Sequence, residues 1–256
     1  MTRFIDTHCH LDLLEKPMDQ VLHEAGESGV DRLITISVDG SSLSKVKRLL
    51  SKWPQIYGTA GVHPHSASEF GKEGPESIRN AVQQETRIVA VGEIGLDYHY
   101  LHSPRDVQKL VFREQLKLAE ELDMPVVLHT REAEEDTLKQ LRECPPPRMG
   151  VAHSFTGSRK MAEELLDMGW YLGINGIISF KKTDDLKQVV RHFPIQRILL
   201  ETDAPYLSPV PYRGKPNAPN RIPVIAECLA GILEIPLEQL ARQTCLNAEE
   251  LFGLLN

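Results

Sequence analysis

Short apolar segments alternate with longer amphipathic segments along the 256-residue chain, and this alternation limits the choice of folds more than any other feature. The amphipathic segments predict helices over residues 18–28, 43–52, 76–86, 106–122, 132–142, 159–168 and 184–192. The apolar segments predict strands that begin near Phe4, Leu33, Tyr57, Ile88, Val126, Gly150, Trp170 and Ile198. About eight β-then-α units, with two more helices after the last strand, favour an α/β (β/α)8 TIM barrel that forms one domain over residues 1–256.

An open, doubly wound parallel sheet is the alternative architecture for such a pattern. The barrel is preferred because polar residues recur at the carboxyl ends of several strands, whereas a doubly wound sheet gathers them at one switch point. The clearest helix is 106–122, where Val107, Leu110, Val111, Leu118 and Leu122 recur on a helical period. The glycine-rich fingerprints of dinucleotide and P-loop sites do not occur.

The composition is that of a soluble globular protein, with 41% hydrophobic and 25% charged residues. No apolar run reaches the roughly 20 residues that cross a bilayer, and the N-terminus has no signal-peptide hydrophobic region. The four cysteines form no C-x-x-C pair, so a reducing cytoplasm is expected. A net charge of −7 argues against non-specific coating of nucleic acid but leaves a nucleic-acid enzyme open.

A His-x-His pair, His8 and His10, follows the first predicted strand segment, Phe4-Ile5-Asp6-Thr7. Residues two apart on a strand point to the same face, so both imidazoles project together. Two neutral imidazoles side by side provide half of a divalent metal site.

Later strands end in further potential ligands, and in a parallel barrel all these ends meet at one rim. Four imidazoles and two carboxylates exceed the needs of one tetrahedral ion and indicate two divalent ions, Zn²⁺, Mn²⁺ or Mg²⁺, with imidazoles favouring the first two. Glu93 is the candidate bridge, and Asp203 is the candidate ligand that also accepts a proton from metal-activated water. The predicted ligands are His8, His10, Glu93, His129, His153 and Asp203.

Six motifs are spread along the chain: residues 4–12 (FIDTHCHLD), 61–65 (GVHPH), 92–98 (GEIGLDY), 129–133 (HTREA), 153–157 (HSFTG) and 201–206 (ETDAPY). Through these motifs the whole chain resembles the TatD family of metal-dependent DNases, within the amidohydrolase-like barrel hydrolases. The resemblance implies the same six metal ligands, with Asp203 and Glu93 at the reaction centre. It also implies hydrolysis of DNA phosphodiester bonds, with exonuclease trimming from the 3′ end.

Two positions depart from the family pattern. Ser154 stands where the family often has Cys, a change that leaves metal ligation untouched. Ala218 stands where members usually carry Glu, which affects the contacts of the loop 212–219 and bears on substrate preference.

Four further residues are candidates for substrate binding at the rim. Arg213 and Lys215 follow the last strand and offer two cations for phosphates, with a solvated Gly- and Pro-rich turn as the alternative. His63 ends the third strand and is a candidate for hydrogen bonding, or for anchoring its loop. Arg131 follows His129 and is expected either to bind phosphate or to pair with Glu132 or Glu134.

The preferred function is therefore a cytoplasmic, divalent-metal-dependent deoxyribonuclease with DNA as its substrate and no membrane partner. The first alternative keeps the metals but takes a small ester, lactone, amide or aminoacyl ester as substrate, because the same chemistry attacks carbonyl carbon. The second is a non-catalytic metal-binding protein, which Asp203 argues against. The oligomeric state is left open and a monomer is compatible with the sequence.

Overall fold

The computed structural model describes residues 2–254, and its centre is a sheet of eight parallel strands. Each strand pairs with the next in chain order from β1 to β8. The ring is closed where Cys9 bridges to Ala204 and the amide of His10 donates to the Ala204 carbonyl at 2.7 Å. The (β/α)8 barrel is thus confirmed over the doubly wound sheet. The strands are β1 (Phe4–Cys9), β2 (Val30–Thr35), β3 (Ile56–Ala60), β4 (Ile88–Asp97), β5 (Val126–Arg131), β6 (Gly150–Ala152), β7 (Tyr171–Ile174) and β8 (Ile198–Leu200).

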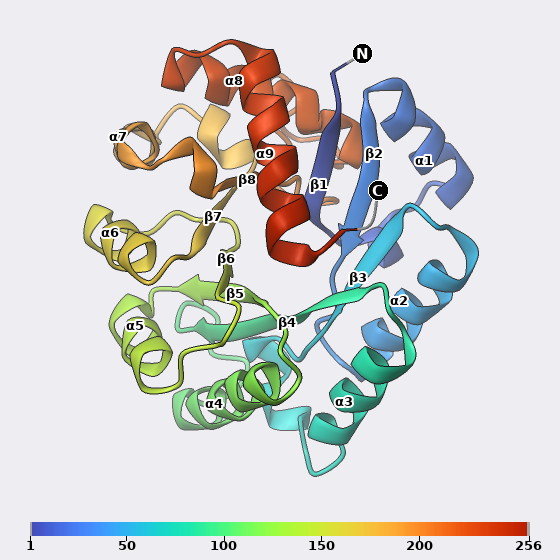
Figure 1. The fold of residues 1–256 in the computed structure, drawn as a ribbon, viewed down its shortest axis with the longest axis vertical. Helices are drawn as coiled ribbons and strands as arrows, with labels where there is room; N and C mark the ends of the chain where they lie inside the picture. The colour runs from blue at the N-terminus through green and yellow to red at the C-terminus, as the bar shows by residue number, and fades with distance from the viewer. Residues whose placement is uncertain (1, 255–256) are drawn as a thin grey trace.

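Helices surround the barrel, and Figure 1 shows α9 lying across one end of it. The helices are α1 (Met18–Glu27), α2 (Gly40–Lys52), α3 (Gly74–Gln84), α4 (Arg105–Glu121), α5 (Glu134–Glu143), α6 (Arg159–Asp167), α7 (Asp184–His192), α8 (Ile222–Leu233) and α9 (Leu237–Phe252). Short 3-10 helices are η1 (Leu11–Leu13), η2 (Pro64–Glu69), η3 (Gly176–Ser179), η4 (Ile195–Arg197) and η5 (Pro219–Arg221).

The helix expected at 106–122 is present as α4, but its buried face differs in one position. Val111 and Leu118 are buried, whereas Leu110 is 58% exposed. The buried face instead includes Phe112 and Leu116. The periodicity of the sequence predicted the helix correctly, but packing against the barrel determines which of its apolar residues are buried.

The two ends of the barrel interior differ in chemistry. At the amino-terminal end, inward residues such as Val127, Val151 and Leu199 form an apolar cluster with Ala248 and Phe252 of α9. Burial of this layer supplies the main stabilising free energy of the barrel interior. Towards the carboxyl ends of the strands, the inward side chains are polar. One end of the barrel therefore stabilises the fold, and the other carries the side chains that can take part in chemistry.

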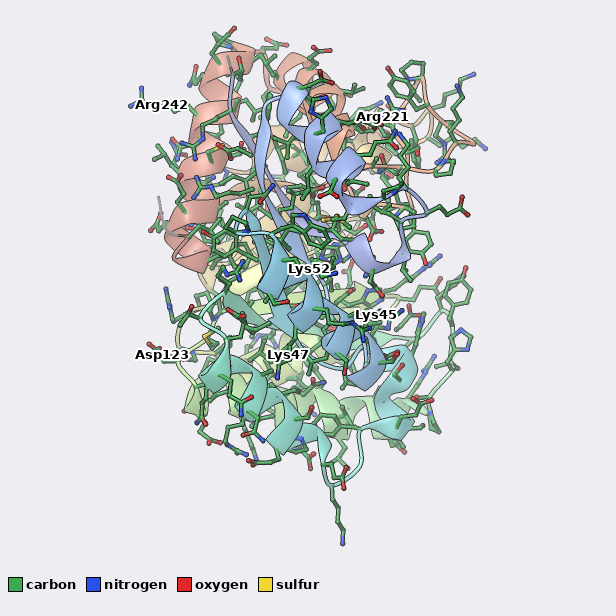
Figure 2. All side chains as sticks on the ribbon, turned by 90° about the vertical axis from the view of Figure 1, so that its right-hand side faces the viewer. Lys45, Lys47, Lys52, Asp123, Arg221 and Arg242 are labelled. Atoms are coloured by element: carbon green, nitrogen blue, oxygen red, sulfur yellow. The ribbon has the colours of Figure 1, made fainter. Side chains whose placement is uncertain are left out.

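The side view in Figure 2 separates these two faces. Arg242 on α9 and Asp123 lie on one side, and Arg221, which ends η5, lies on the other. In residues 2–254, no helix combines the length and the apolar character needed to cross a membrane.

The contact between β5 and β6 gives a test of the barrel packing. A Cβ added at Gly150 would lie 2.2 Å from the Val126 carbonyl oxygen and 2.8 Å from the Trp170 ring, while at Gly26 in α1 nothing lies within 4 Å. We expect Gly150→Ala to lower the free energy of unfolding by about 1–3 kcal/mol because the core is close-packed. Gly26→Ala is expected to leave it unchanged or to raise it by up to about 1 kcal/mol. Urea denaturation measures both, and equal stability of the two variants would contradict the packing described.

Candidate metal centre

Glu93 lies at the centre of the polar end of the barrel. It occupies an irregular point of β4, where Gly92 pairs with Val127 and Ile94 with Leu128, so that Glu93 itself is left between two pairs. Its Oε1 atom lies 2.9 Å from His129 Nδ1 and 3.8 Å from His153 Nε2. Its Oε2 atom lies 3.5 Å from His8 Nε2. The two oxygens of one buried carboxylate therefore face different groups of imidazoles.

Asp203 approaches the same centre from the loop after β8. Its Oδ1 atom lies 3.4 Å from His10 Nε2 and 3.7 Å from His8 Nε2. The backbone of Asp203 is left-handed, with φ of 57°, and its amide donates to the His8 carbonyl at 2.8 Å. Aspartate tolerates this conformation better than most residues, and here it turns the carboxylate back towards β1. All six residues predicted as ligands are thus brought together.

The donor atoms of His8 fit a metal ion better than any partner within the protein. His8 is 1% exposed, and neither of its ring nitrogens has a hydrogen-bond partner among the described residues. The His8 and His153 rings stack with centroids 3.4 Å apart and planes inclined by 14°. Buried polar nitrogens without partners are costly. A cation bound to one nitrogen of His8 would reduce this cost, so the residues present fit a divalent metal.

Carboxylates on the outer side orient two of the imidazoles. The Nε2 atom of His129 lies 3.0 Å from Asp97 Oδ2, which leaves Nδ1 directed at Glu93. The Nδ1 atom of His153 lies 3.0 Å from Glu201 Oε1, although it is not aligned as a hydrogen bond. Such outer partners select which nitrogen of a ligating histidine is free for the metal.

Space for Glu201 depends on Gly173 in β7. A Cβ at position 173 would lie 2.3 Å from Glu201 Oε2. The fully buried Glu201 carboxylate also accepts from the Ser154 amide at 2.7 Å. The absence of a side chain at Gly173 therefore lets the Glu201 carboxylate reach His153.

The tautomer of His63 is fixed by a backbone hydrogen bond, and it distinguishes His63 from the six candidate metal ligands. Its Nδ1 accepts from the backbone amide of His65 at 3.1 Å, so in the neutral ring Nε2 carries the proton. That Nε2 lies 3.6 Å from Glu93 Oε1. Although His63, Glu93 and His129 form one of the clusters with metal-binding spacing, the tautomer makes His63 a hydrogen-bond donor at the centre.

The charges of the centre are strongly coupled. Burial opposes ionisation of Glu93, but the neighbouring His153 and His63 outweigh it and hold the pKa of Glu93 well below its usual value. Burial likewise opposes protonation of His153, while Glu201 and Glu93 raise the pKa of His153 to about 10. Burial and the charge of His153 lower the pKa of His8. The carboxylates of Glu93 and Glu201 thus favour positive charge among these imidazoles.

The substrate-binding candidates occupy the rim around this centre. Within residues 2–254, Arg131 forms no ion pair with Glu132 or Glu134, and its guanidinium lies 4.8 Å from the centroid of the Tyr100 ring. Arg213 lies 3.9 Å over the Phe180 ring, and Lys215 is exposed. The loop 212–219 is anchored by Asn217, whose side-chain amide donates to the Thr202 carbonyl at 2.8 Å.

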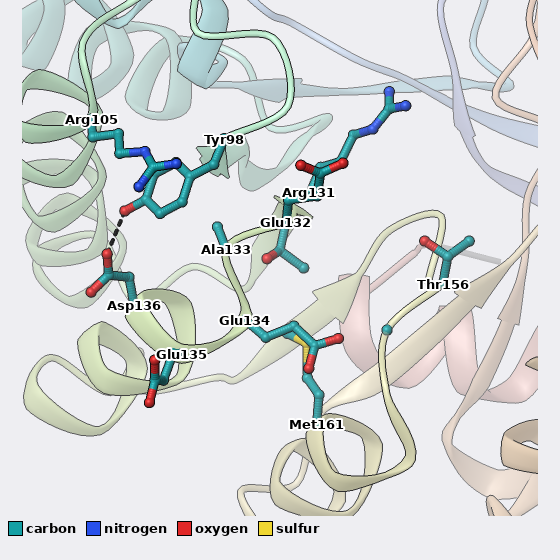
Figure 3. Close-up of a pocket in the computed structure, with 12 residues that line it drawn as sticks. Tyr98, Arg105, Arg131, Glu132, Ala133, Glu134, Glu135, Asp136, Thr156 and Met161 are labelled. Atoms are coloured by element: carbon teal, nitrogen blue, oxygen red, sulfur yellow. Dashed lines mark hydrogen bonds between the residues drawn. The ribbon is translucent and has the colours of Figure 1, made fainter.

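A cavity of about 720 Å³ opens between the loops that follow β4, β5 and β6. Figure 3 shows Arg105 against Tyr98 on one side, with the Arg131 guanidinium extending to the side away from Arg105. The Tyr98 hydroxyl donates to Asp136 at 2.6 Å. Tyr98 is 9% exposed, so it packs under its loop as a structural residue.

Sequence reasoning assigned no role to Asp97, which the structure places behind His129. The Asp97 carboxylate also lies 3.0 Å from His65 Nε2 and accepts from the Tyr100 amide at 2.8 Å. A signal was present, because Asp97 is four residues after Glu93 on one strand and therefore shares its face.

Comparison with known proteins agrees with this geometry. The family described as TatD related DNase matches residues 5–253. The chain is 36% identical to an uncharacterized metal-dependent hydrolase, YabD, of Bacillus subtilis, over 97% of this chain and 98% of that protein. It is 36% identical to the 3'-5' ssDNA/RNA exonuclease TatD of Erwinia tasmaniensis, over 93% of this chain and 95% of that protein. The crystal structure of YjjV, a TatD homolog from Escherichia coli, superposes with a TM-score of 0.94 at 31% identity, covering 99% of both chains. The chain therefore belongs to the family of TatD-related DNases and is an enzyme of the hydrolase class.

Proposed function

We propose that residues 1–256 act as one cytoplasmic deoxyribonuclease domain that uses two divalent ions bridged by Glu93. The observation that carries the proposal is the division of the Glu93 carboxylate, whose Oε2 faces His8 while Oε1 faces His129 and His153. His8, His10 and Asp203 would hold one ion, and His129 and His153 the other. Imidazole-rich sets favour Zn²⁺ or Mn²⁺ over Mg²⁺.

The ions, when bound, would supply Lewis acidity that polarises a phosphodiester and makes water a better nucleophile at neutral pH. Asp203 is suited to accept the proton of that water because it stays ionised: burial opposes its charge, but His10, His153 and His8 lower its pKa. His63 presents an Nε2 proton at the same centre and is suited to donate a hydrogen bond to a phosphate oxygen.

DNA is preferred as substrate because a relative 36% identical over 93% of this chain carries the name 3'-5' ssDNA/RNA exonuclease. By the same likeness, we propose cleavage from the 3′ end. Small esters, lactones, amides and aminoacyl esters remain the alternative substrates, because the same chemistry attacks carbonyl carbon. A panel of end-labelled DNA, RNA and a chromogenic ester separates these substrates.

The first prediction concerns metal removal. We expect chelation to abolish hydrolysis and added Mn²⁺ or Mg²⁺ to restore it, since the six candidate ligands converge on one centre. The chelated protein is expected to keep its circular dichroism spectrum, because the apolar layer under α9 contains none of these residues. Full activity in excess chelator would contradict the metal mechanism.

The second prediction concerns Asp203. Asp203→Asn keeps the shape of the side chain but removes the proton acceptor and a ligand charge, so turnover should fall at least about 10²-fold. Asp39→Asn is the matched control, because Asp39 caps α2 on the same rim and asparagine caps helices equally well. Turnover of both variants, with unfolding temperatures, tests this. Near-normal turnover of Asp203→Asn would place the base elsewhere.

The third prediction concerns phosphate contacts of the loop 212–219. If Arg213 and Lys215 bind phosphates, replacing both with alanine should raise KM for single-stranded DNA. It should also reduce the slope of log affinity against log salt by roughly 1.4, at about 0.7 per contact.

The control for this variant removes two cations from the opposite face. Arg148 precedes β6 and Arg242 lies on α9, and both are exposed. Their double alanine variant changes the net charge equally but should leave the salt slope unchanged. Equal slopes in the two double variants would show that the loop does not contact phosphate.

A further inference from the structure

Exposed aromatic side chains have an unusual distribution in this protein. The chain contains seven Phe, six Tyr and two Trp residues, all within residues 2–254. Only two of these fifteen are largely exposed, Tyr100 at 47% and Tyr206 at 53%. Both follow the carboxyl ends of strands, on the rim that surrounds the candidate metal centre.

The two tyrosines stand on opposite sides of this rim. Tyr100 follows β4 and Tyr206 follows β8, and these strands lie across from each other in a closed ring of eight. Each is tied to a residue of the centre or to its support. The Tyr100 amide donates to the Asp97 carboxylate at 2.8 Å, and the Tyr206 amide donates to the Asp203 carbonyl at 2.8 Å. A ligand that crosses the centre from β4 to β8 would meet both rings.

Each ring is accompanied by cations suited to a phosphate backbone. The Arg131 guanidinium lies 4.8 Å from the centroid of the Tyr100 ring, with no ion pair recorded among the described residues. On the other side, the Tyr206 ring meets the His10 ring edge-on at 6.0 Å. Ser208, two residues after Tyr206, donates to the Lys215 carbonyl at 2.6 Å, which holds the Arg213–Lys215 segment beside this tyrosine.

We infer that Tyr100 and Tyr206 are two base-stacking subsites for one single strand of DNA that crosses the metal centre. This rests on the proposed nuclease function and adds the residues that would bind the bases of the strand. Unpaired bases offer their flat faces to exposed aromatic rings irrespective of sequence, and adjacent cations bind the intervening phosphates. Bases within a duplex are stacked on each other, so the same two rings would give a duplex little binding energy.

The test measures binding separately from cleavage. Fluorescence anisotropy of a labelled oligothymidylate is measured in an Asp203→Asn background, so that bound strands are not cut. Tyr100→Ala and Tyr206→Ala should each raise Kd about five- to a hundredfold, the range for loss of one stacked base. Tyr100→Phe and Tyr206→Phe should bind normally. Leu246→Ala, which removes a 47% exposed apolar residue of α9, is the matched control and should have no effect.

An abasic scan of the oligonucleotide locates the two subsites. Removing the base that stacks on Tyr206 should abolish the effect of Tyr206→Ala, and a different position should do the same for Tyr100→Ala. Affinity for blunt duplex DNA should be insensitive to both variants. Single-strand affinity unchanged by both alanine variants would overturn the inference even if the protein cleaves DNA. A protein that neither binds nor cleaves DNA would instead refute the proposed function itself.

Discussion

The buried carboxylate of Glu93 is the constraint on which the rest of the centre depends. A carboxylate that is 3% exposed is stable as an anion only if positive groups surround it. Here imidazoles from β1, β5 and the end of β6 surround it, and the charges of His153 and His63 are the main causes that lower its pKa against the effect of burial. Without a cation the same arrangement is costly, because it packs four histidines close together and leaves the ring nitrogens of His8 with no hydrogen-bond partner in residues 2–254. The histidines therefore supply only part of the positive charge that this centre favours, and a divalent cation would supply the rest.

The barrel tolerates this polar centre because its apolar layer, which stabilises the fold, is separate from the polar layer. Val127 and His129 point inward from β5, two residues apart, and the same spacing separates Val151 in β6 from His153, which directly follows that strand. The inner residue of each pair packs towards α9, and the outer one reaches the centre. Destabilising polar groups are thus added above an intact core, which is why loss of metal should cost activity before it costs the fold.

Most of the fold, and the convergence of the six candidate ligands on one centre, could be predicted from the sequence, because both follow from short periods. Alternation along strands places His8 with His10, and strand ends converge in any parallel barrel. The roles of the residues around these ligands were harder to predict from the sequence. Asp97 was missed because its role depends on the distance from its carboxylate to His129 Nε2, across two strands. The tautomer of His63 depends on a backbone amide two residues away, and the exposure of Leu110 depends on how α4 sits on the barrel. None of these three features produces a periodic pattern in the sequence, so a search for periodicity does not find them.

The proposed role of Glu93 as a bridge between two ions is the central claim, and crystals grown with Mn²⁺ test it most directly through anomalous scattering. The account predicts two anomalous peaks per chain, one on each side of the Glu93 carboxylate, with His8, His10 and Asp203 at one and His129 and His153 at the other. A single peak, or two peaks that Glu93 does not bridge, would contradict it.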